Sequence, residues 1–499
     1  MYRSGMSCGA ISMASRRSIT NLPLQPAIKP RQMQLKSKVV GLVLALLGSL
    51  PALLARDSTQ LRQLERDAYL KIIQSYHPVI RAADIDVLNA RANLMRARGV
   101  FDPQAKANYH SKTLDGKEYY TYFTPGITIP TWYGLEFKAG IDDARGYYLN
   151  PETTPGAVSY VGAKLVATNI FFDVRRAGVE QARVLVRQSE ADRLLAVNDL
   201  YYQSISAYWN WWLSWEQRRI WEEARVVAAE RMQFVRQEYL AGARAAIDTT
   251  EALTQIQSLD AQFLTSDLTL QNAGVTLNTY LWYQNNTLVP WEETWLPTRP
   301  QLRPIPPLTF FLEQLTEHPK LQSARAKIEF LNIDLRMKNQ YLFPKISVGG
   351  SVLGKDWNPL PNERSGNYLR RNYKLEADLS IPLFLREARG NLQMARLKTQ
   401  QASLAQDIAY IDLEAKVRSY YNEAINLSQQ QTLWEASFAA YERLLQGEII
   451  RFENGESTLF LINARQSKLL EASQKLLDIY AKRGKAEAAL YWAAGLLIQ

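Results

Sequence analysis

The side chains that most often do chemistry in enzymes are scarce in this sequence of 499 residues. It contains three histidines, His77, His110 and His318, and a single cysteine, Cys8. Because the whole chain has only three histidines, we do not expect an imidazole-rich metal site or catalytic site. No glycine-rich motif of the phosphate-binding types occurs either. The sequence therefore predicts a protein that is not an enzyme, with no cofactor, no catalytic residue and no metal site.

The aromatic residues offer another chemistry, the stacking of a ligand. Five tryptophans are concentrated in a short segment: Trp209, Trp211, Trp212, Trp215 and Trp221. They belong to a region in which apolar side chains recur in steps of three and four, as on one face of a helix. Packing between helices therefore explains these tryptophans better than ligand binding does.

The positive charge of the chain is concentrated at its N-terminus. The formal net charge is +10, but residues 1–55 hold seven basic residues and no acid, which leaves 52 basic against 49 acidic residues, or +3. Within this leader, Lys36 and Lys38 precede an apolar core at 39–50, the order found in a cleaved secretory signal peptide. A single membrane anchor is the alternative. We expect export, a remaining chain without cysteine, and no nucleic acid partner.

The positions of the prolines indicate where long helices are allowed. None occurs from Gly156 to Val289 or from Leu383 to Gln499, whereas six fall between residues 290 and 307. Proline removes a helix donor and clashes with the preceding turn, so the two proline-free stretches are free to be helical. We expect long helices at about 173–240 and 386–452, turns near 242 and 455, and return helices at about 246–282 and 458–495.

The chain contains an internal duplication. His77-Pro78 recurs as His318-Pro319, at an offset of 241 residues, whereas later landmarks such as Gly242 and Gly455 recur at an offset of 213. The first copy is therefore 28 residues longer in the region before its long helix. We predict a leader at 1–55, a first repeat at 56–282, a proline-rich linker at 283–307 and a second repeat at 308–499.

Alternating apolar and polar residues predict strands within 104–170 and within 345–382. The alternation is strictest at 373–381 and also occurs at 346–348, 135–141 and 160–167. Such a strand could cross a bilayer or belong to a soluble sheet. Two strands per repeat give four per chain, too few to close a membrane barrel, because an open sheet edge cannot face lipid. A barrel would have to be shared between chains.

At this point the sequence resembles the bacterial outer-membrane efflux proteins of the TolC type, from about Leu61 to Gly495. The resemblance rests on an ordered, duplicated set of motifs. These are Pro78 and Pro319, Phe172–Arg176 and Pro382–Arg386, Ala207–Trp209 and Ser419–Tyr421, and Tyr239–Gly242 and Phe452–Gly455.

The resemblance implies a mainly α fold with β structure: a homotrimer with a 12-stranded outer-membrane β-barrel continuous with a periplasmic α-helical barrel. It implies a passive duct whose partners are a periplasmic membrane-fusion adaptor, an inner-membrane transporter of RND, ABC or similar type, and outer-membrane lipid. The alternative is a secreted periplasmic coiled-coil structural or adaptor protein. The family commonly has Asn at the positions of His77 and His318, so we interpret both as helix-start variants rather than ligands.

The resemblance also assigns candidate sites. The strand-to-helix transitions would lie at Phe172, Asp173, Pro382 and Phe384. The candidate entrance constriction is Asp248, Glu251, Ser457 and Asn463, with an acid supported only in the first repeat, where the two acids could form a ring of charge or be ordinary exposed helix acids. The periplasmic tip that meets the adaptor would consist of Tyr239, Ala241, Gly242, Phe452, Asn454, Gly455 and Glu456.

Overall fold

The structure is a computed structural model that describes residues 62–166, 172–283, 285–290, 295–357, 371–381 and 383–497. All of these residues belong to one compact unit, Leu61–Gln499. The predicted leader with its apolar core at 39–50, and Pro382, lie outside the described residues. Among the helices of this part of the chain, none is long and apolar enough to cross a membrane.

The first repeat contains short helices, a set of strands and a long helical hairpin, in that order. The short strand β1 is followed by two short helices, four strands and the two long helices of the hairpin. These elements are β1 (Arg62–Leu64), α1 (Arg66–Tyr76), α2 (Pro78–Arg98), the 3-10 turn η1 (Gly99–Phe101), β2 (Gln104–Leu114), β3 (Lys117–Pro130), β4 (Leu135–Arg145), β5 (Gly156–Val166), α4 (Val174–Leu240) and α5 (Ala246–Asn278).

The second repeat has the same order with fewer strands. Its elements are β6 (Trp295–Pro297), α6 (Leu308–Gln314), the 3-10 turn η2 (Leu315–Glu317), α7 (Pro319–Gln340), β7 (Lys345–Lys355), β8 (Tyr373–Ser380), α9 (Arg386–Glu453) and α10 (Leu459–Ala493). The short strands β1 and β6 pair in parallel, which ties the start of the first repeat to the linker region.

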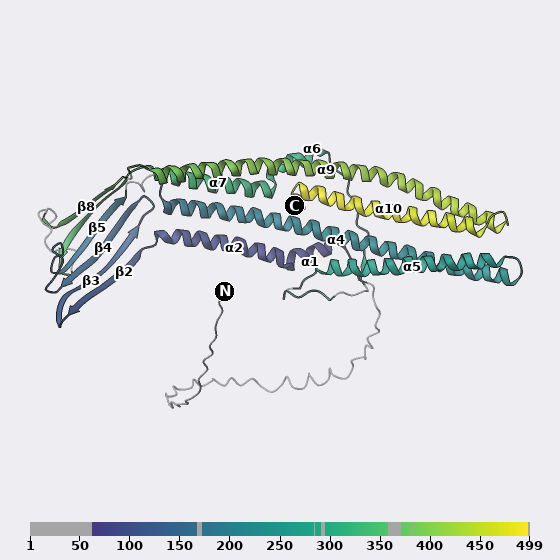
Figure 1. Ribbon diagram of the computed structural model, residues 1–499, viewed down its shortest axis with the longest axis horizontal. Helices are drawn as coiled ribbons and strands as arrows, with labels where there is room; N and C mark the ends of the chain where they lie inside the picture. Colours follow the sequence, from purple (N-terminus) through teal and green to yellow (C-terminus); the bar gives the residue numbers. More distant parts are fainter. Residues whose placement is uncertain are drawn as a thin grey trace, which may run out of the picture. The chain divides into compact units, whose positions relative to one another are not determined.

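The long helices α4 and α9 have 67 and 68 residues. Each is therefore about 100 Å long at ~1.5 Å per residue. Near the sheet, α4 packs against α2 and α7; farther along, it packs against α5 and α10. Helix α9 packs against α7 and then α10. Figure 1 shows the sheet at one end of the long helices and the turns of the two hairpins at the other.

The two duplicated histidines begin equivalent helices. The Nδ1 of His77 accepts a hydrogen bond from the Val79 amide at 3.2 Å, and that of His318 accepts one from the Lys320 amide at 3.1 Å. In both cases proline occupies the first helical position, where no amide donor is needed. The interpretation of both histidines as helix-start residues is confirmed.

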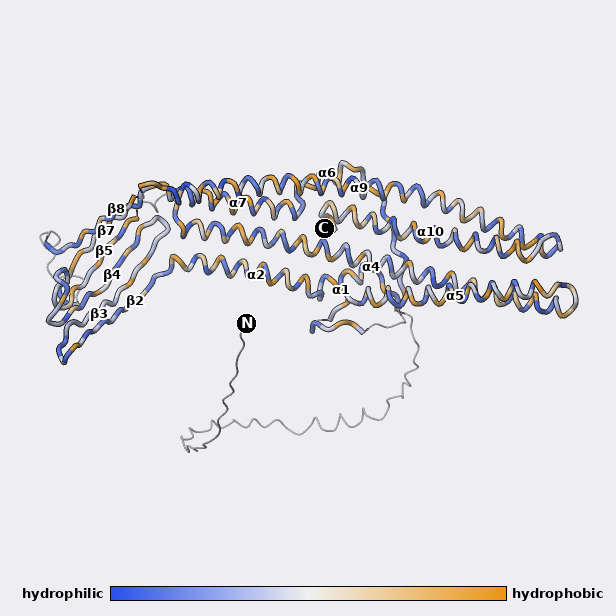
Figure 2. Tube along the Cα trace, in the orientation of Figure 1, coloured by the Kyte–Doolittle hydropathy of each residue, from blue (hydrophilic) through white to orange (hydrophobic). Residues whose placement is uncertain are grey.

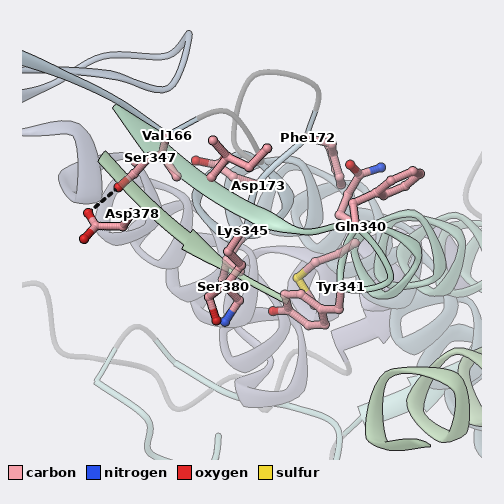
Figure 3. Close-up of a pocket in the computed structure, with 13 residues that line it drawn as sticks. Val166, Phe172, Asp173, Gln340, Tyr341, Lys345, Ser347, Asp378 and Ser380 are labelled. Atoms are coloured by element: carbon pink, nitrogen blue, oxygen red, sulfur yellow. Dashed lines mark hydrogen bonds between the residues drawn. The ribbon is translucent and has the colours of Figure 1, made fainter. Parts of the chain in front are cut away.

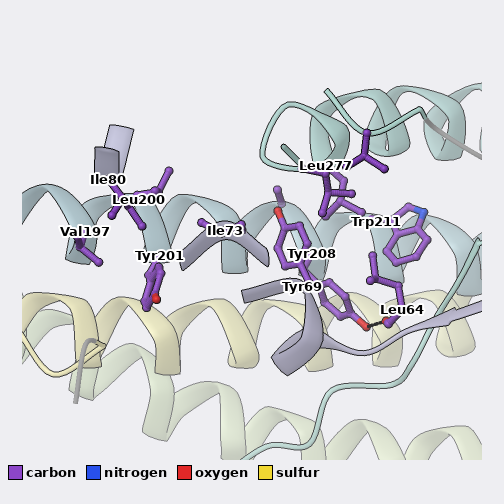
Figure 4. Packing of buried hydrophobic residues seen from close by; sticks show 13 residues of the cluster. Leu64, Tyr69, Ile73, Ile80, Val197, Leu200, Tyr201, Tyr208, Trp211 and Leu277 are labelled. Atoms are coloured by element: carbon purple, nitrogen blue, oxygen red, sulfur yellow. Dashed lines mark hydrogen bonds between the residues drawn. The ribbon is translucent and has the colours of Figure 1, made fainter. Parts of the chain in front are cut away.

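The tryptophans pack between helices, as the sequence indicates. Trp209, Trp211 and Trp212 are each 1% exposed, and Trp209 lies against the backbone of Gly484 on α10. Figure 4 shows the neighbouring cluster around Tyr69 and Tyr208. There the Tyr208 hydroxyl donates to the Leu64 carbonyl at 2.6 Å, so this buried polar group has a hydrogen-bond partner.

The sheet has six strands in the order β2-β3-β4-β5-β7-β8, and all its pairs are antiparallel. The expected two strands per repeat occur only in the second repeat, because the first contributes four. The additional strands belong to the longer region of the first copy. Asp115 and Gly116, with φ of 51° and 73°, form the tight turn that joins β2 to β3.

The two faces of the sheet differ in chemistry. One row of register partners crosses all six strands as Gln104, Thr128, Lys138, Gly162, Ser351 and Lys374; the adjacent row is Ala105, Ile127, Ala139, Val161, Val352 and Tyr373. Neighbouring residues of a strand point to opposite faces, so the first row lies on a polar face and the second on an apolar face. Figure 2 shows this alternation of hydropathy along the strands.

Candidate functional site

The two hairpin turns, at the end of the long helices remote from the sheet, have the same backbone geometry. Gly242 and Gly455 have φ of +77° and +81°. In the first turn the Ala243 backbone amide donates to the Glu238 carbonyl; in the second the Glu456 backbone amide donates to the Arg451 carbonyl. This pattern ends a helix with a glycine in the left-handed conformation, which other residues adopt only with strain. The local sequence thus fixes where each long helix ends.

The predicted tip residues lie at these turns and are accessible. Tyr239, Ala241, Gly242, Asn454, Gly455 and Glu456 are exposed in the described chain, and Phe452 is half-buried. Phe452 is held by the first hairpin, because the Arg244 guanidinium lies 4.3 Å from the centre of its ring. Arg244 also pairs with Glu238. The two turns are therefore in contact through a cation–π interaction.

A second contact between the hairpins joins two of the predicted constriction residues. The Asn463 side-chain amide donates to Glu251 at 3.1 Å, and its oxygen accepts from Arg231 at 3.0 Å. Arg231 also donates to Gln466 at 2.5 Å. Burial lowers the pKa of Arg231. These hydrogen bonds to charged groups link α4 and α5 of the first repeat to α10 of the second.

The other two predicted constriction residues have separate partners. Asp248 lies 3.9 Å from Arg244, so its charge is partly compensated within the chain. The Ser457 hydroxyl donates to Glu448 at 2.6 Å, and this hydrogen bond, helped by Arg451 and Arg465, holds the pKa of the Glu448 carboxyl below its usual range. The structure thus brings Glu251 and Asn463 together, and leaves Asp248 and Ser457 in different contacts.

Hydrogen bonds and ion pairs between side chains hold the strand-to-helix transition of the first repeat in place. Asp173 caps α4 by accepting from the Arg176 amide at 2.9 Å, and it pairs with Arg175 at 3.0 Å. Arg175 continues to Glu136 of β4 at 3.0 Å. Phe172 is 5% exposed. This chain of contacts connects the sheet to the long helix.

A cavity of about 390 Å³ lies beside this transition. Figure 3 shows Phe172, Asp173 and Tyr341 around it, together with the hydrogen bond from Ser347 to Asp378. In the second repeat, Phe384 is exposed and lies near Arg386 at 5.3 Å. The two predicted transitions therefore have different surroundings: buried in the first repeat and open in the second.

Sequence reasoning missed the arginines that connect these sites. Arg231 and Arg244 pair with residues whose distance along the chain carries no periodic signal; Arg231 and Asn463 are 232 positions apart. Only Gly242, two residues before Arg244, marked that region. Arg175 belongs to the motif Phe172–Arg176, but that motif did not reveal its ion pair with Glu136. In the described part of the chain, no three His, Cys, Asp or Glu side chains are grouped so as to hold a metal ion.

One of the two repeats matches the model of a known protein family. Residues 313–496, most of the second repeat, match the family model of the outer membrane efflux proteins. No curated protein matches the sequence.

The solved structures that the chain resembles cover most of its length. The Campylobacter jejuni CmeC outer membrane channel is 15% identical, with a TM-score of 0.61 over 86% of this chain and 85% of that one. The open state of the Neisseria gonorrhoeae MtrE outer membrane channel is 17% identical, with a TM-score of 0.61 over 86% and 88%.

A membrane protein from Pseudomonas aeruginosa is also similar, with 17% identity and a TM-score of 0.64 over 86% of this chain and 92% of that one. At these identities the comparisons establish the fold. The resemblance to the TolC type and the mainly helical fold class with a sheet are confirmed. The second repeat carries the outer membrane efflux protein domain, and the described chain has the fold of the outer-membrane efflux channels.

Proposed function

We propose that this chain is the outer-membrane duct of a tripartite export system, for efflux or type I secretion. Three copies would form a passive channel that carries substrates from the periplasm, or from an inner-membrane pump, to the exterior. The long helices would reach across the periplasm and the sheet would lie in the outer membrane.

The observation that carries this proposal is the exposed apolar face of the sheet. Large apolar side chains on this face lie open to the surroundings in the single chain, at 36% to 73% exposure: Ile127, Phe137, Val161, Leu165, Ile346, Val348, Leu375 and Leu379. Such a continuous patch is unfavourable in water, and a lipid environment would cover it. The opposite face, with Lys138, Lys164 and Glu376, suits a water-filled lumen.

The turns at Gly242 and Gly455 would meet the periplasmic adaptor. Nothing lies within 4 Å of a Cβ placed on either glycine. A Gly455→Val substitution therefore meets no neighbour in the single chain, but strains the turn by about 1–2 kcal/mol. We expect export to be lost while the trimer stays in the membrane. Efflux assays and native gels check this, and unaffected export would remove the docking role.

The acids near the turn supply a test of the proposed entrance. Asp248 and Glu251 repeated three times around an axis would attract cations, although Arg244 already compensates part of the Asp248 charge and Asn463 donates a hydrogen bond to Glu251. Replacing both acids with Ala should reduce cation preference in planar bilayers. Unchanged selectivity would mean that the two acids are ordinary helix residues.

Extraction distinguishes this function from a secreted coiled-coil structural or adaptor protein. A membrane-embedded duct should remain in the membrane fraction after alkaline and high-salt washing, and should migrate as a heat-sensitive trimer on gels. Release by washing would contradict the proposal. Deletion of the gene should also raise sensitivity to exported compounds, and expression of the intact chain should restore resistance.

A further inference from the structure

The six-stranded sheet is open at both edges. Every residue of β2 and of β8, the first and last strands of the sheet, is exposed, whereas the inner strands are mostly half-buried. Within the described residues, each of these two strands pairs on one side only. An unpaired edge leaves backbone donors and acceptors without partners, which lipid cannot supply.

The number of strands in the chain allows identical copies to join edge to edge. Successive strands are antiparallel throughout the sheet, so with six strands β2 and β8 run in opposite directions. Pairing β8 of one copy with β2 of the next therefore continues the same antiparallel pattern. An odd number of strands would make this junction parallel.

The two edges also match in chemistry. On the polar face, β2 presents Lys106, His110 and Lys112 and no acid, whereas β8 presents Glu376 and Asp378 beside Lys374. Opposite charges on adjacent strands stabilise a pair, and like charges destabilise it.

The apolar faces of the two edges agree as well. On this face β2 carries Ala105, Ala107 and Tyr109, and β8 carries Leu375, Ala377 and Leu379. When copies are joined in this way, the apolar face therefore continues from one chain to the next without a break.

We propose that β8 of each chain pairs with β2 of a neighbouring copy, so that three chains of six strands close one barrel of 18 strands. This deepens the proposed function, on which it rests, and replaces the expected 12-stranded barrel. Barrel diameter grows roughly in proportion to strand number, so the exit would be about one and a half times as wide. Barrels of about this strand number leave an aqueous channel.

The lengths of the strands are compatible with this arrangement. β2, β4, β5 and β7 have 11 residues each, β3 has 14 and β8 has 8. A strand needs about 9–11 residues to cross a bilayer at the usual tilt, so five of the strands are long enough and β8 is about one residue short. The two additional strands of the first repeat, β2 and β3, are therefore long enough to belong to the barrel wall.

Cross-linking in the outer membrane tests the junction. In a Cys8→Ser background, cysteines replace Ala107 on β2 and Ala377 on β8. Within one chain these positions are five strand spacings apart, about 24 Å, beyond a short bismaleimide of about 8 Å reach. Between copies they would lie on adjacent strands. We expect covalent dimers and trimers on denaturing gels. Because the register between β8 and the neighbouring β2 is not fixed in advance, the β8 cysteine is also placed at Leu375 or Leu379, on the same face.

A pair on β4 and β8 determines whether the additional strands β2 and β3 are in the wall, and a pair on β4 and β5 is its positive control. Cysteines at Ala139 and Val161, register partners on β4 and β5, should link within the chain in the same trimers. Cysteines at Ala139 and Ala377 should not link between copies, because β2 and β3 would separate them.

The outcomes distinguish the strand count from the function. Covalent trimers through Ala139 and Ala377 would overturn the 18-stranded barrel and leave the duct in place. A membrane-retained trimer with no link from β2 to any β8 position would overturn the edge pairing. Release of the protein by alkaline washing would instead contradict the proposed function itself.

Discussion

The contact between Trp209 and Gly484 predicts opposite effects for the same substitution at two helical glycines. A Cβ on Gly484 would lie 2.1 Å from Trp209 Cζ2. The Trp209 ring cannot move freely, because it is 1% exposed and packs against the rings of Trp212 and Tyr480 at 5.6 and 5.7 Å. Gly390, on α9, has nothing within 4 Å of its Cβ position.

The magnitude follows from two opposing effects. Overpacking a core costs typically about 1–3 kcal/mol, and the rigid surroundings of Trp209 favour the upper end. Alanine gains about 1 kcal/mol over glycine in a helix. Gly484→Ala should therefore lower the free energy of unfolding by about 2 kcal/mol, whereas Gly390→Ala should raise it by up to about 1 kcal/mol.

Urea unfolding of the detergent-solubilised protein measures both variants, with tryptophan emission as the signal. The chain has twelve tryptophans, so their combined emission reports unfolding of the protein as a whole. The expected order of midpoints is Gly484→Ala, then the unmodified protein, then Gly390→Ala. A Gly484→Ala variant as stable as the unmodified protein would refute the packing argument.

Two further substitutions test the hairpin contact and a helix start. Arg231→Met keeps the length of the side chain but removes its hydrogen bonds to Asn463 and Gln466, each worth about 1.5–3 kcal/mol. We expect a higher single-channel conductance and an unchanged temperature of trimer dissociation. A conductance equal to that of the unmodified protein would contradict a role of this contact at the entrance. Burial lowers the pKa of His318 to about 4. The unfolded chain therefore binds the extra proton below about pH 6.5, and stability should fall by up to about 3 kcal/mol as the pH drops from 6.5 towards 4. His318→Asn keeps an acceptor for the Lys320 amide and should remove most of this loss between pH 7.5 and 4.5; equal losses in both proteins would contradict the assignment.

Much of the helical architecture could be predicted from local sequence. Proline-free stretches and glycines such as Gly242 act through the backbone of their own segment, so their effect is readable without the fold. The same holds for Asp173, which accepts from an amide three residues later. The strands at 135–141 and 373–381 were visible because one face is apolar.

The strands β2 and β3 lie within 104–170, where we predict strands, but neither was located individually, for a physical reason. Along β2, polar residues alternate with small ones such as Ala105 and Ala107, so the contrast between faces is weak. Along β3, Pro125 and Gly126 interrupt the pattern. The pair Asp115-Gly116 was the available signal, since it favours a two-residue hairpin turn. The hairpin contacts of Arg231 could not be predicted, because they depend on how two repeats pack.

The two ends of the described chain satisfy their polar groups in different ways. At the hairpin turns, Arg231, Asn463 and Glu251 bond to one another within a single chain, and Arg244 covers Phe452. At the sheet, both edge strands lack a partner on one side. The hairpins, whose polar groups already have partners within the chain, can shift without loss of contacts between subunits. A sheet edge whose backbone groups lack hydrogen-bond partners requires a neighbouring chain. Substitutions at the turns should therefore alter conductance and adaptor binding, and substitutions in β2 or β8 should alter assembly.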